Sequence, residues 1–218
     1  MNVEGNPAAL DELERLGVPA VPAVAVGDRA VHGWNPEGLA RLLGVTVSAA
    51  PRLPPEALAS RLDLILKSTA RLLGRVGPDA IDWTPPERDR TLGDLGYHVF
   101  RLSLAFADAV DLGGLPHAWF EEKAPPELHD GGALARYGSL VRARLAGWFD
   151  GAAPEEYARI VQTYYGPQSA HDLLERTTWH AAQHLRQLAA LAERLGITPL
   201  EPLPTDAFRD LPLPVSLC

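Results

Sequence analysis

Residues 169–188 read SAHDLLERTTWHAAQHLRQL, and this stretch decides the fold. Its apolar and small residues recur every three or four positions, which is the spacing of one face of a helix. The stripe continues to Leu195 and ends at Gly196, a typical residue just beyond a helix C-terminus. Two positions near the middle of the stripe carry His180 and His184. The stretch therefore predicts a long amphipathic helix with a histidine pair one turn apart on one side.

Three earlier segments have the same period and predict three more helices. The first covers 58–76 and is ended by Gly77-Pro78, and the second follows a Thr91 cap and ends before Gly113. The third covers 134–148 and is closed by Asp150-Gly151. An unusually long link separates the second helix from the third. The sequence thus predicts a mainly α protein with a four-helix bundle that has a crossover connection.

Proline-rich stretches divide the chain. Residues 48–54 form a proline-rich linker, since proline cannot donate to a helix or a sheet ladder. The domains predicted on either side are a small segment over 1–47 and the bundle over 55–196. A proline-rich tail over 197–218 follows.

The small segment has the pattern of an α/β unit. A helix from Pro7 to Leu16 is followed by an apolar strand over 21–26 and a Gly27-Asp28 turn. Ala30-Val31 supplies a second strand that pairs back as a hairpin, and a helix covers 36–43. The expected order is helix, strand, strand, helix.

Composition excludes several classes of protein. The chain has 218 residues, of which 46% are hydrophobic and 22% charged, as expected of a globular domain with its own core. It has no apolar run of about 18 residues, so we expect no membrane span. A net charge of −8 argues against a nucleic-acid partner. The N-terminus lacks a signal-peptide pattern, so we expect a cytoplasmic location. The sequence has a single cysteine, Cys218, which excludes a disulfide within the chain.

Three histidines occupy positions where a leucine would be expected. His98 lies between Leu95 and Leu102 on the stripe of the second helix, and His180 and His184 lie on the stripe of the fourth. Three buried imidazoles without partners would be costly, whereas one divalent ion satisfies all of them. Spacing alone leaves open whether they are metal ligands or hydrogen-bonded core residues. The remaining histidines fall near turns or helix ends and are assigned no role: His32, His117, His129 and His171.

The bundle resembles the DinB superfamily over about 140 residues. Residues 169–188 are similar to the last helix of that family, which typically has a His-x3-His pair and then a glutamine, here Gln187. The string TLGDLGYH (91–98) is similar to its second helix, and Asp82-Trp83 fits the tryptophan of its first loop. The resemblance implies a DinB-like fold with one metal ion on His98, His180 and His184. Ala181 departs from the pattern, because many members have an acidic residue there.

The resemblance also implies a chemistry. Three neutral nitrogen ligands leave a coordination position open, and zinc is the default ion, with nickel, iron and manganese as alternatives. Family members include thiol-dependent S-transferases, which implies a metal-bound low-molecular-weight thiol that attacks an electrophile. Two alternatives stay open: a metal-dependent hydrolase with bound hydroxide, and a non-catalytic, stress-related metal-binding or interaction protein. Four residues are in helical phase with the triad but receive no role: Tyr97, Arg101, Gln183 and Gln187.

The first segment resembles the C-terminal half of a glutaredoxin or thioredoxin-like domain. The resemblance rests on GVPAVPAVAVGD (17–28) and GWNPE (33–37), and it implies a cis peptide at Val21-Pro22 and a turn at Gly33. The family's first strand and cysteine-containing helix are absent, so dithiol reduction is excluded. The segment is then a remnant, a truncated domain, a docking platform or a packing appendage. Its incomplete sheet leaves an unpaired edge, so we expect a homodimer.

Overall fold

The computed structural model describes residues 3, 6–18, 23–33, 35–46, 52–86 and 89–214. The chain forms two compact units, one of Met1–Arg52 with Gln162–Pro167 and one of Leu53–Val161 with Gln168–Cys218. The predicted cis bond at Val21-Pro22 and the single cysteine, Cys218, lie outside the described residues.

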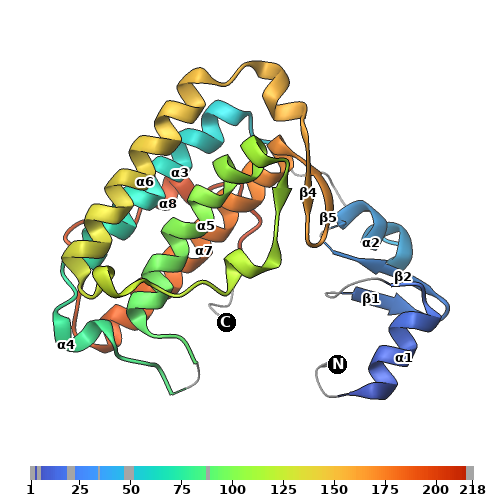
Figure 1. The fold of residues 1–218 in the computed structure, drawn as a ribbon, viewed down its shortest axis with the longest axis horizontal. Coiled ribbons are helices and arrows are strands. Elements are labelled where there is room, and N and C mark those ends of the chain that lie inside the picture. Colours follow the sequence, from blue (N-terminus) through green and yellow to red (C-terminus); the bar gives the residue numbers. More distant parts are fainter. Residues whose placement is uncertain are drawn as a thin grey trace. The chain divides into compact units, whose positions relative to one another are not determined.

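Four long helices form the larger unit (Figure 1): α3 (Pro55–Leu73), α5 (Leu92–Leu112), α6 (Gly131–Gly151) and α7 (Ala170–Arg194). Helix α3 packs on α6 and α7, and α5 packs on the same two helices. Helices α3 and α5 therefore lie diagonally across the bundle, as do α6 and α7. The helical fold class predicted from the sequence is confirmed.

The link between α5 and α6 is the predicted crossover. Figure 1 shows that α5 and α6 run in the same direction, so the link has to return along the bundle before α6 begins. It contains a short strand, β3 (Gly114–Leu115), and two 3-10 turns, η1 (His117–Phe120) and η2 (Pro126–Leu128). We refer to residues 113–130 as the crossover link.

Side-chain caps explain where the bundle helices begin. The Thr91 hydroxyl accepts a hydrogen bond from the Asp94 amide at 3.0 Å, as the sequence predicted. Asp130 caps α6 and Ser169 caps α7 in the same way. Each cap satisfies an amide that the first turn of a helix leaves without a partner.

Helix α3 ends three residues earlier than the sequence predicted. The apolar stripe continues to Val76, but the helix ends at Leu73 and Gly74 caps it. Beyond this point the Val76 amide donates to the Leu73 carbonyl in a turn. The start of α6 lies against this turn, since a side chain at Gly131 would meet the Leu73 carbonyl oxygen at 2.0 Å. Tertiary packing thus ends the helix before the apolar pattern does.

The core lies between the four helices. Its largest fully buried side chains are Phe100, Phe106, Leu58, Leu62, Ile65, Leu66, Leu72, Leu73, Leu92, Leu134, Leu174 and Leu185. Helices α5 and α6 approach closely at Gly138, where the Phe100 ring occupies the space of a missing side chain. None of the described helices combines the length and apolar content needed to cross a bilayer.

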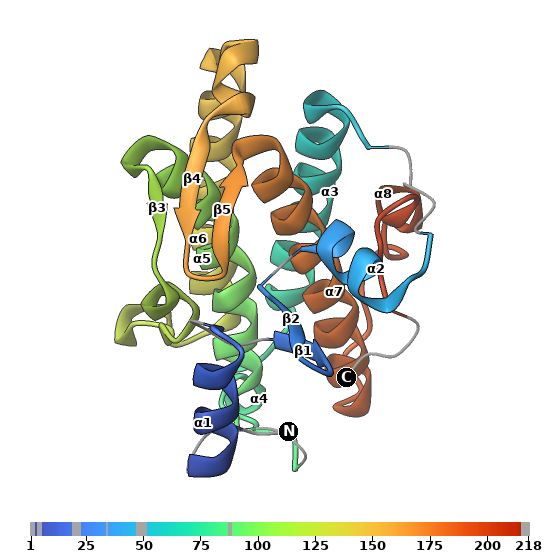
Figure 2. The same ribbon diagram turned by 90° about the vertical axis from the view of Figure 1, so that its right-hand side faces the viewer.

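Shorter elements complete the chain beyond Leu53: α4 (Pro78–Ile81), η3 (Pro154–Ala158), β4 (Ile160–Thr163), β5 (Gly166–Ser169) and α8 (Thr205–Phe208). Strand β4 lies between β3 and β5 in a three-stranded sheet (Figure 2). The tail packs on α7, where the Trp179 indole donates to the Pro212 carbonyl at 2.6 Å. Its Ala207 and Leu211 side chains are buried.

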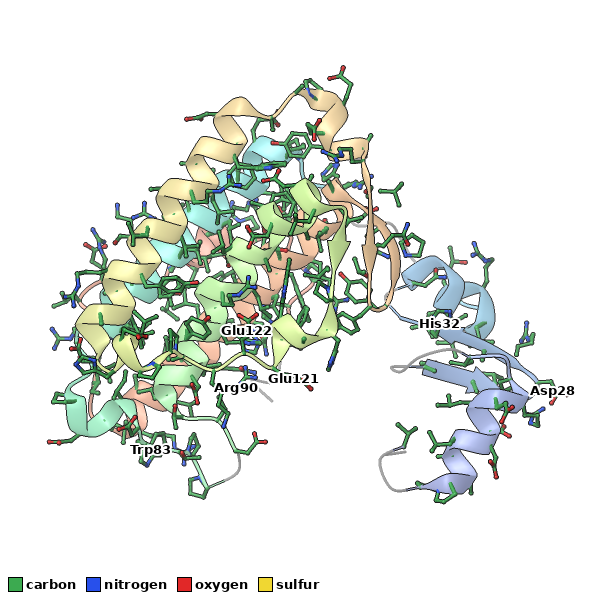
Figure 3. All side chains as sticks on the ribbon, in the orientation of Figure 1. Asp28, His32, Trp83, Arg90, Glu121 and Glu122 are labelled. Atoms are coloured by element: carbon green, nitrogen blue, oxygen red, sulfur yellow. The ribbon has the colours of Figure 1, made fainter. Side chains whose placement is uncertain are left out.

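The smaller unit has the predicted order of elements. These are α1 (Pro7–Arg15), β1 (Ala23–Val26), β2 (Arg29–His32) and α2 (Pro36–Leu43). Strands β1 and β2 pair antiparallel, with Val24 opposite Val31. Asn6 and Asn35 cap the two helices with their side chains. Arg15 binds Asp28 in the hairpin turn at 2.8 Å, which ties α1 to the strands (Figure 3).

Candidate metal centre

Two packed helices bring the three predicted histidines together. His98 is on α5 and is 5% exposed, and His180 and His184 are one turn apart on α7. The ring centroid of His98 is 5.1 Å from that of each α7 histidine, and the two α7 rings are 4.3 Å apart. One nitrogen of each ring lies within 4.8 Å of the others. The predicted triad therefore converges on a single point.

Gln187 determines which nitrogen of His184 faces this point. Its amide oxygen lies 2.7 Å from His184 Nδ1, and because an amide oxygen only accepts, Nδ1 has to donate. The neutral ring then has a lone pair on Nε2, which lies 3.0 Å from His180 Nε2. A partner that orients a ligating histidine through its other nitrogen is usual at metal sites.

Burial keeps His98 and His180 neutral. Desolvation lowers the pKa of His98 to about 3, and the nearby Arg90 charge and His184 act in the same direction. Desolvation, with the neighbouring His184, also holds the pKa of His180 well below its ordinary value of 6.5. Neutral imidazoles keep their lone pairs available at physiological pH, which is the form that binds a metal.

The donor set fits a divalent transition-metal ion. Within the described part of the chain, the candidate ligand group consists of His98, His180 and His184, with no carboxylate or thiolate in it. Three histidine nitrogens suit zinc, nickel, iron and related ions. A site with three protein ligands leaves a position for an exogenous molecule, which distinguishes catalytic from structural zinc sites.

The crossover link lies beside the triad. The Phe120 ring is edge-on to His98 and His180, with centroid distances of 6.4 and 6.3 Å. Arg90 donates to the Phe120 carbonyl at 3.4 Å. Arg90 and the two acidic residues that follow Phe120 are found together in Figure 3, where the link passes α5.

An ion pair joins the link to α5 one turn beyond His98. Arg101 Nε is 2.5 Å from Glu122 Oε2, and Arg101 Nη2 is 3.2 Å from Glu122 Oε1. The guanidinium carbon lies 4.7 Å from the ring centroid of Trp119. The Tyr97 hydroxyl is 3.5 Å from the same carboxylate. Arg101 and Tyr97 were noted in the sequence for their helical phase, but their partner Glu122 was missed.

Among the described residues, the other histidines are not part of the ligand group of the triad. His32 belongs to the smaller unit, and His129 is exposed beside Asp130. His117 stacks on Phe120 at 6.3 Å, and a ring nitrogen of His171 lies 2.8 Å from the Leu53 carbonyl.

Trp83, which carries part of the family resemblance, and Gln183, which is in helical phase with the triad, both have structural partners. The Trp83 carbonyl accepts from the Leu92 amide, and the Arg194 guanidinium lies 5.1 Å from the Trp83 ring centroid. Gln183 is buried and accepts from Arg186 at 3.1 Å.

The fold and the triad define a helical-bundle protein with a group of three histidines that could hold a metal ion. The family model of the DinB superfamily matches residues 61–188, more than half of the chain, and the protein belongs to this superfamily. No curated protein matches the chain. Among solved structures, a DinB-like protein from Bacillus subtilis is similar, with 18% identity and a TM-score of 0.55. The match covers 67% of this chain and 96% of that one, and it supports the bundle fold alone.

Proposed function

We propose that the protein is a metal-dependent enzyme that activates a low-molecular-weight thiol for transfer to an electrophile. The convergence of three histidine nitrogens within 4.8 Å, with no fourth ligand in the described group, carries the proposal. Membership in the DinB superfamily supports it. When bound, a divalent ion supplies Lewis acidity that lowers the pKa of a thiol or water at the open position.

The residues around the triad have separate tasks in this proposal. His98 and the α7 pair hold the ion, and Gln187 keeps the His184 lone pair turned toward it. The buried wall of α5 and α7 excludes bulk water, which strengthens electrostatic interactions at the site. Phe120 contributes an apolar surface against which the carbon part of a thiol or an electrophile can pack.

Metal content is the first test. The purified protein should contain about one divalent ion per chain by elemental analysis, with zinc as the expected ion. His98→Ala should lower the content to background, whereas His129→Ala, which changes an exposed histidine, should not. Undiminished metal in the His98 variant would remove this residue from the site.

Thiol binding is the second test and decides the reaction class. A panel of small thiols, added to cobalt-substituted protein, should produce sulfur-to-metal charge-transfer absorption. Turnover of a thiol-reactive electrophile should exceed the solution rate and be lost in His184→Ala. If no common thiol binds the cobalt, the transferase proposal fails, and the hydrolase and non-catalytic alternatives are left.

We also propose that the smaller unit associates with a second copy of the chain. In the described residues β1 pairs with β2 alone, and Val24 and Val26 on β1 are each 43% exposed. An apolar edge strand is a surface that another strand can cover. Val24→Lys should shift the sedimentation coefficient from dimer to monomer, and Leu140→Lys, at an exposed leucine on α6, should not. A monomeric unmodified protein would contradict this proposal.

A further inference from the structure

The crossover link is attached to α5 and its N-terminal flank at three points close to the triad. Arg90, just before α5, donates to the Phe120 carbonyl. One turn into α5, Asp94 accepts from the Ala124 amide at 3.0 Å. Between these two attachments the Glu122 carboxylate binds Arg101 with two hydrogen bonds. The link is thus tied to α5 and its N-terminal flank at Phe120 and at two residues that follow it, Glu122 and Ala124.

The Arg101–Glu122 pair is the strongest of the three attachments. The Arg101 side chain is 13% exposed and that of Glu122 is 37% exposed, so water screens the pair only in part. Arg101 is also 3.6 Å from Asp108 and lies over the Trp119 ring. Loss of Arg101 would leave the partly buried Glu122 carboxylate without this partner, and loss of Glu122 would leave Arg101 with the longer contact to Asp108 alone. The pair therefore holds the link in one position.

This fixed position sets Phe120 against two of the three histidines. The ring is edge-on to both His98 and His180, and His117 stacks on it at 6.3 Å. A molecule that approaches the triad from the side of the crossover link meets this aromatic pair. A small molecule can bind without entering the space that the Phe120 ring fills, whereas a branched or aromatic molecule needs part of that space.

We propose that Phe120 is a specificity-determining residue that limits the size of the molecule reaching the triad, and that Arg101 and Glu122 are the positioning residues that hold it there. The inference rests on the metal site of the proposed function. It assigns the site to small, unbranched thiols and ligands. Larger ones are excluded as long as the ion pair is intact.

Two ligands of different size test the role of Phe120. Cobalt-loaded protein is titrated with imidazole and with 4-phenylimidazole, and binding is followed by the visible absorption of the ion. Phe120→Ala should raise the affinity for 4-phenylimidazole about tenfold, which corresponds to about 1.4 kcal/mol of binding free energy. The same substitution should change the affinity for imidazole less than about threefold. Phe149→Ala is the matched control, because Phe149 is a half-buried aromatic residue that packs on Phe106 within the bundle. An unchanged ratio of the two affinities in Phe120→Ala would overturn the inference.

The ion pair is tested by charge exchange. Arg101→Gln and Glu122→Gln should each shift the affinity ratio in the same direction as Phe120→Ala, and the double variant Arg101→Glu, Glu122→Arg should restore part of it. Asp63→Asn is the control, because it breaks a comparable two-bond ion pair with Arg142 between α3 and α6. Equal effects of the control and the Arg101 variant would assign the ion pair to general stability and contradict a positioning role.

A measurement without metal separates this inference from the proposed function. In metal-free protein, amide hydrogen exchange over 117–124 should be faster in Arg101→Gln than in Asp63→Asn. If cobalt is not retained, the metal site and the inference both fail. If cobalt is retained but no thiol binds it, the transferase proposal fails while the size test still stands. If both imidazoles bind with an unchanged ratio, only the inference fails.

Discussion

Replacing Gly138 with alanine tests how closely α6 packs on α5. A Cβ atom at this position would lie 2.3 Å from Phe100 Cζ and 2.5 Å from Phe100 Cε1. The Phe100 ring is completely buried, so it cannot move away without displacing other core residues. Overpacking of this severity costs about 3 kcal/mol. Alanine is a better helix former than glycine, which stabilises the folded state by about 1 kcal/mol. The expected net decrease in the free energy of unfolding is therefore about 2 kcal/mol.

Gly147 provides a matched control on the same helix. A Cβ atom added at Gly147 would have no neighbouring atom within 4 Å, so alanine there meets only open space. Gly147→Ala should therefore raise the free energy of unfolding by up to about 1 kcal/mol. Urea unfolding of both variants, followed by helical circular dichroism, should give changes of opposite sign. If Gly138→Ala is as stable as the unmodified protein, Phe100 yields to the new methyl group and the packing argument is wrong.

Three further predictions concern the site and its helices. Gln187→Leu should weaken zinc binding by about 10- to 100-fold in a chelator competition, because His184 loses the acceptor that fixes the position of its lone pair. An unchanged zinc affinity would show that Gln187 does not orient His184. In metal-free protein the pKa values of His98 and His180 are lower in the folded than in the unfolded chain, so protons bind preferentially to the unfolded chain. The contribution of the two histidines to the free energy of unfolding is therefore fully present above about pH 6.5 and is lost as the pH falls below it. For His98, with a folded-state pKa of about 3, the loss between about pH 7.5 and about pH 5.5 is about 1.4 kcal/mol, and thermal unfolding that is flat over this range would refute it. Thr91→Ala should cost about 1 kcal/mol through loss of the α5 cap, whereas Thr91→Ser should retain most of it in the same urea assay.

The bundle and the inward positions of the three histidines were predictable because both are periodic features of the sequence, whereas the grouping of the three as one ligand set was implied by the family resemblance. Each long helix shows an apolar stripe, and the three histidines interrupt two of these stripes at inward positions. The Thr91 cap was predictable as well, since a cap is a local contact between residues three apart. Likewise, the length of the crossover link indicated that the chain returns along the bundle.

The surroundings of the triad were not predictable in this way. Phe120 and Glu122 belong to an irregular link with no period, and their partners His98 and Arg101 are more than twenty residues away. Strands β4 and β5 were missed although β1 and β2, which are as short, were predicted. The first pair has an apolar run and a Gly27-Asp28 turn, whereas Gly166 and Pro167 in β5 are residues typical of turns. The end of α3 was placed too late because Gly131, far along the chain, occupies the space beside its last turn.

The order of the three histidines along the chain has a consequence for how the proposed metal site is assembled. More than eighty residues separate His98 from His180, and α7 packs on α3 and α5, both made long before it. During synthesis, α3, α5 and α6 are complete while only one of the three ligands exists. An ion held by the triad would close the chain between His98 and His180 into a loop, and the entropic cost of closing a loop grows only slowly with the number of residues in it. Under the proposed function, the full triad is available to an ion only after α7 has docked, so chains whose bundle is complete should hold the ion more tightly than partly folded ones.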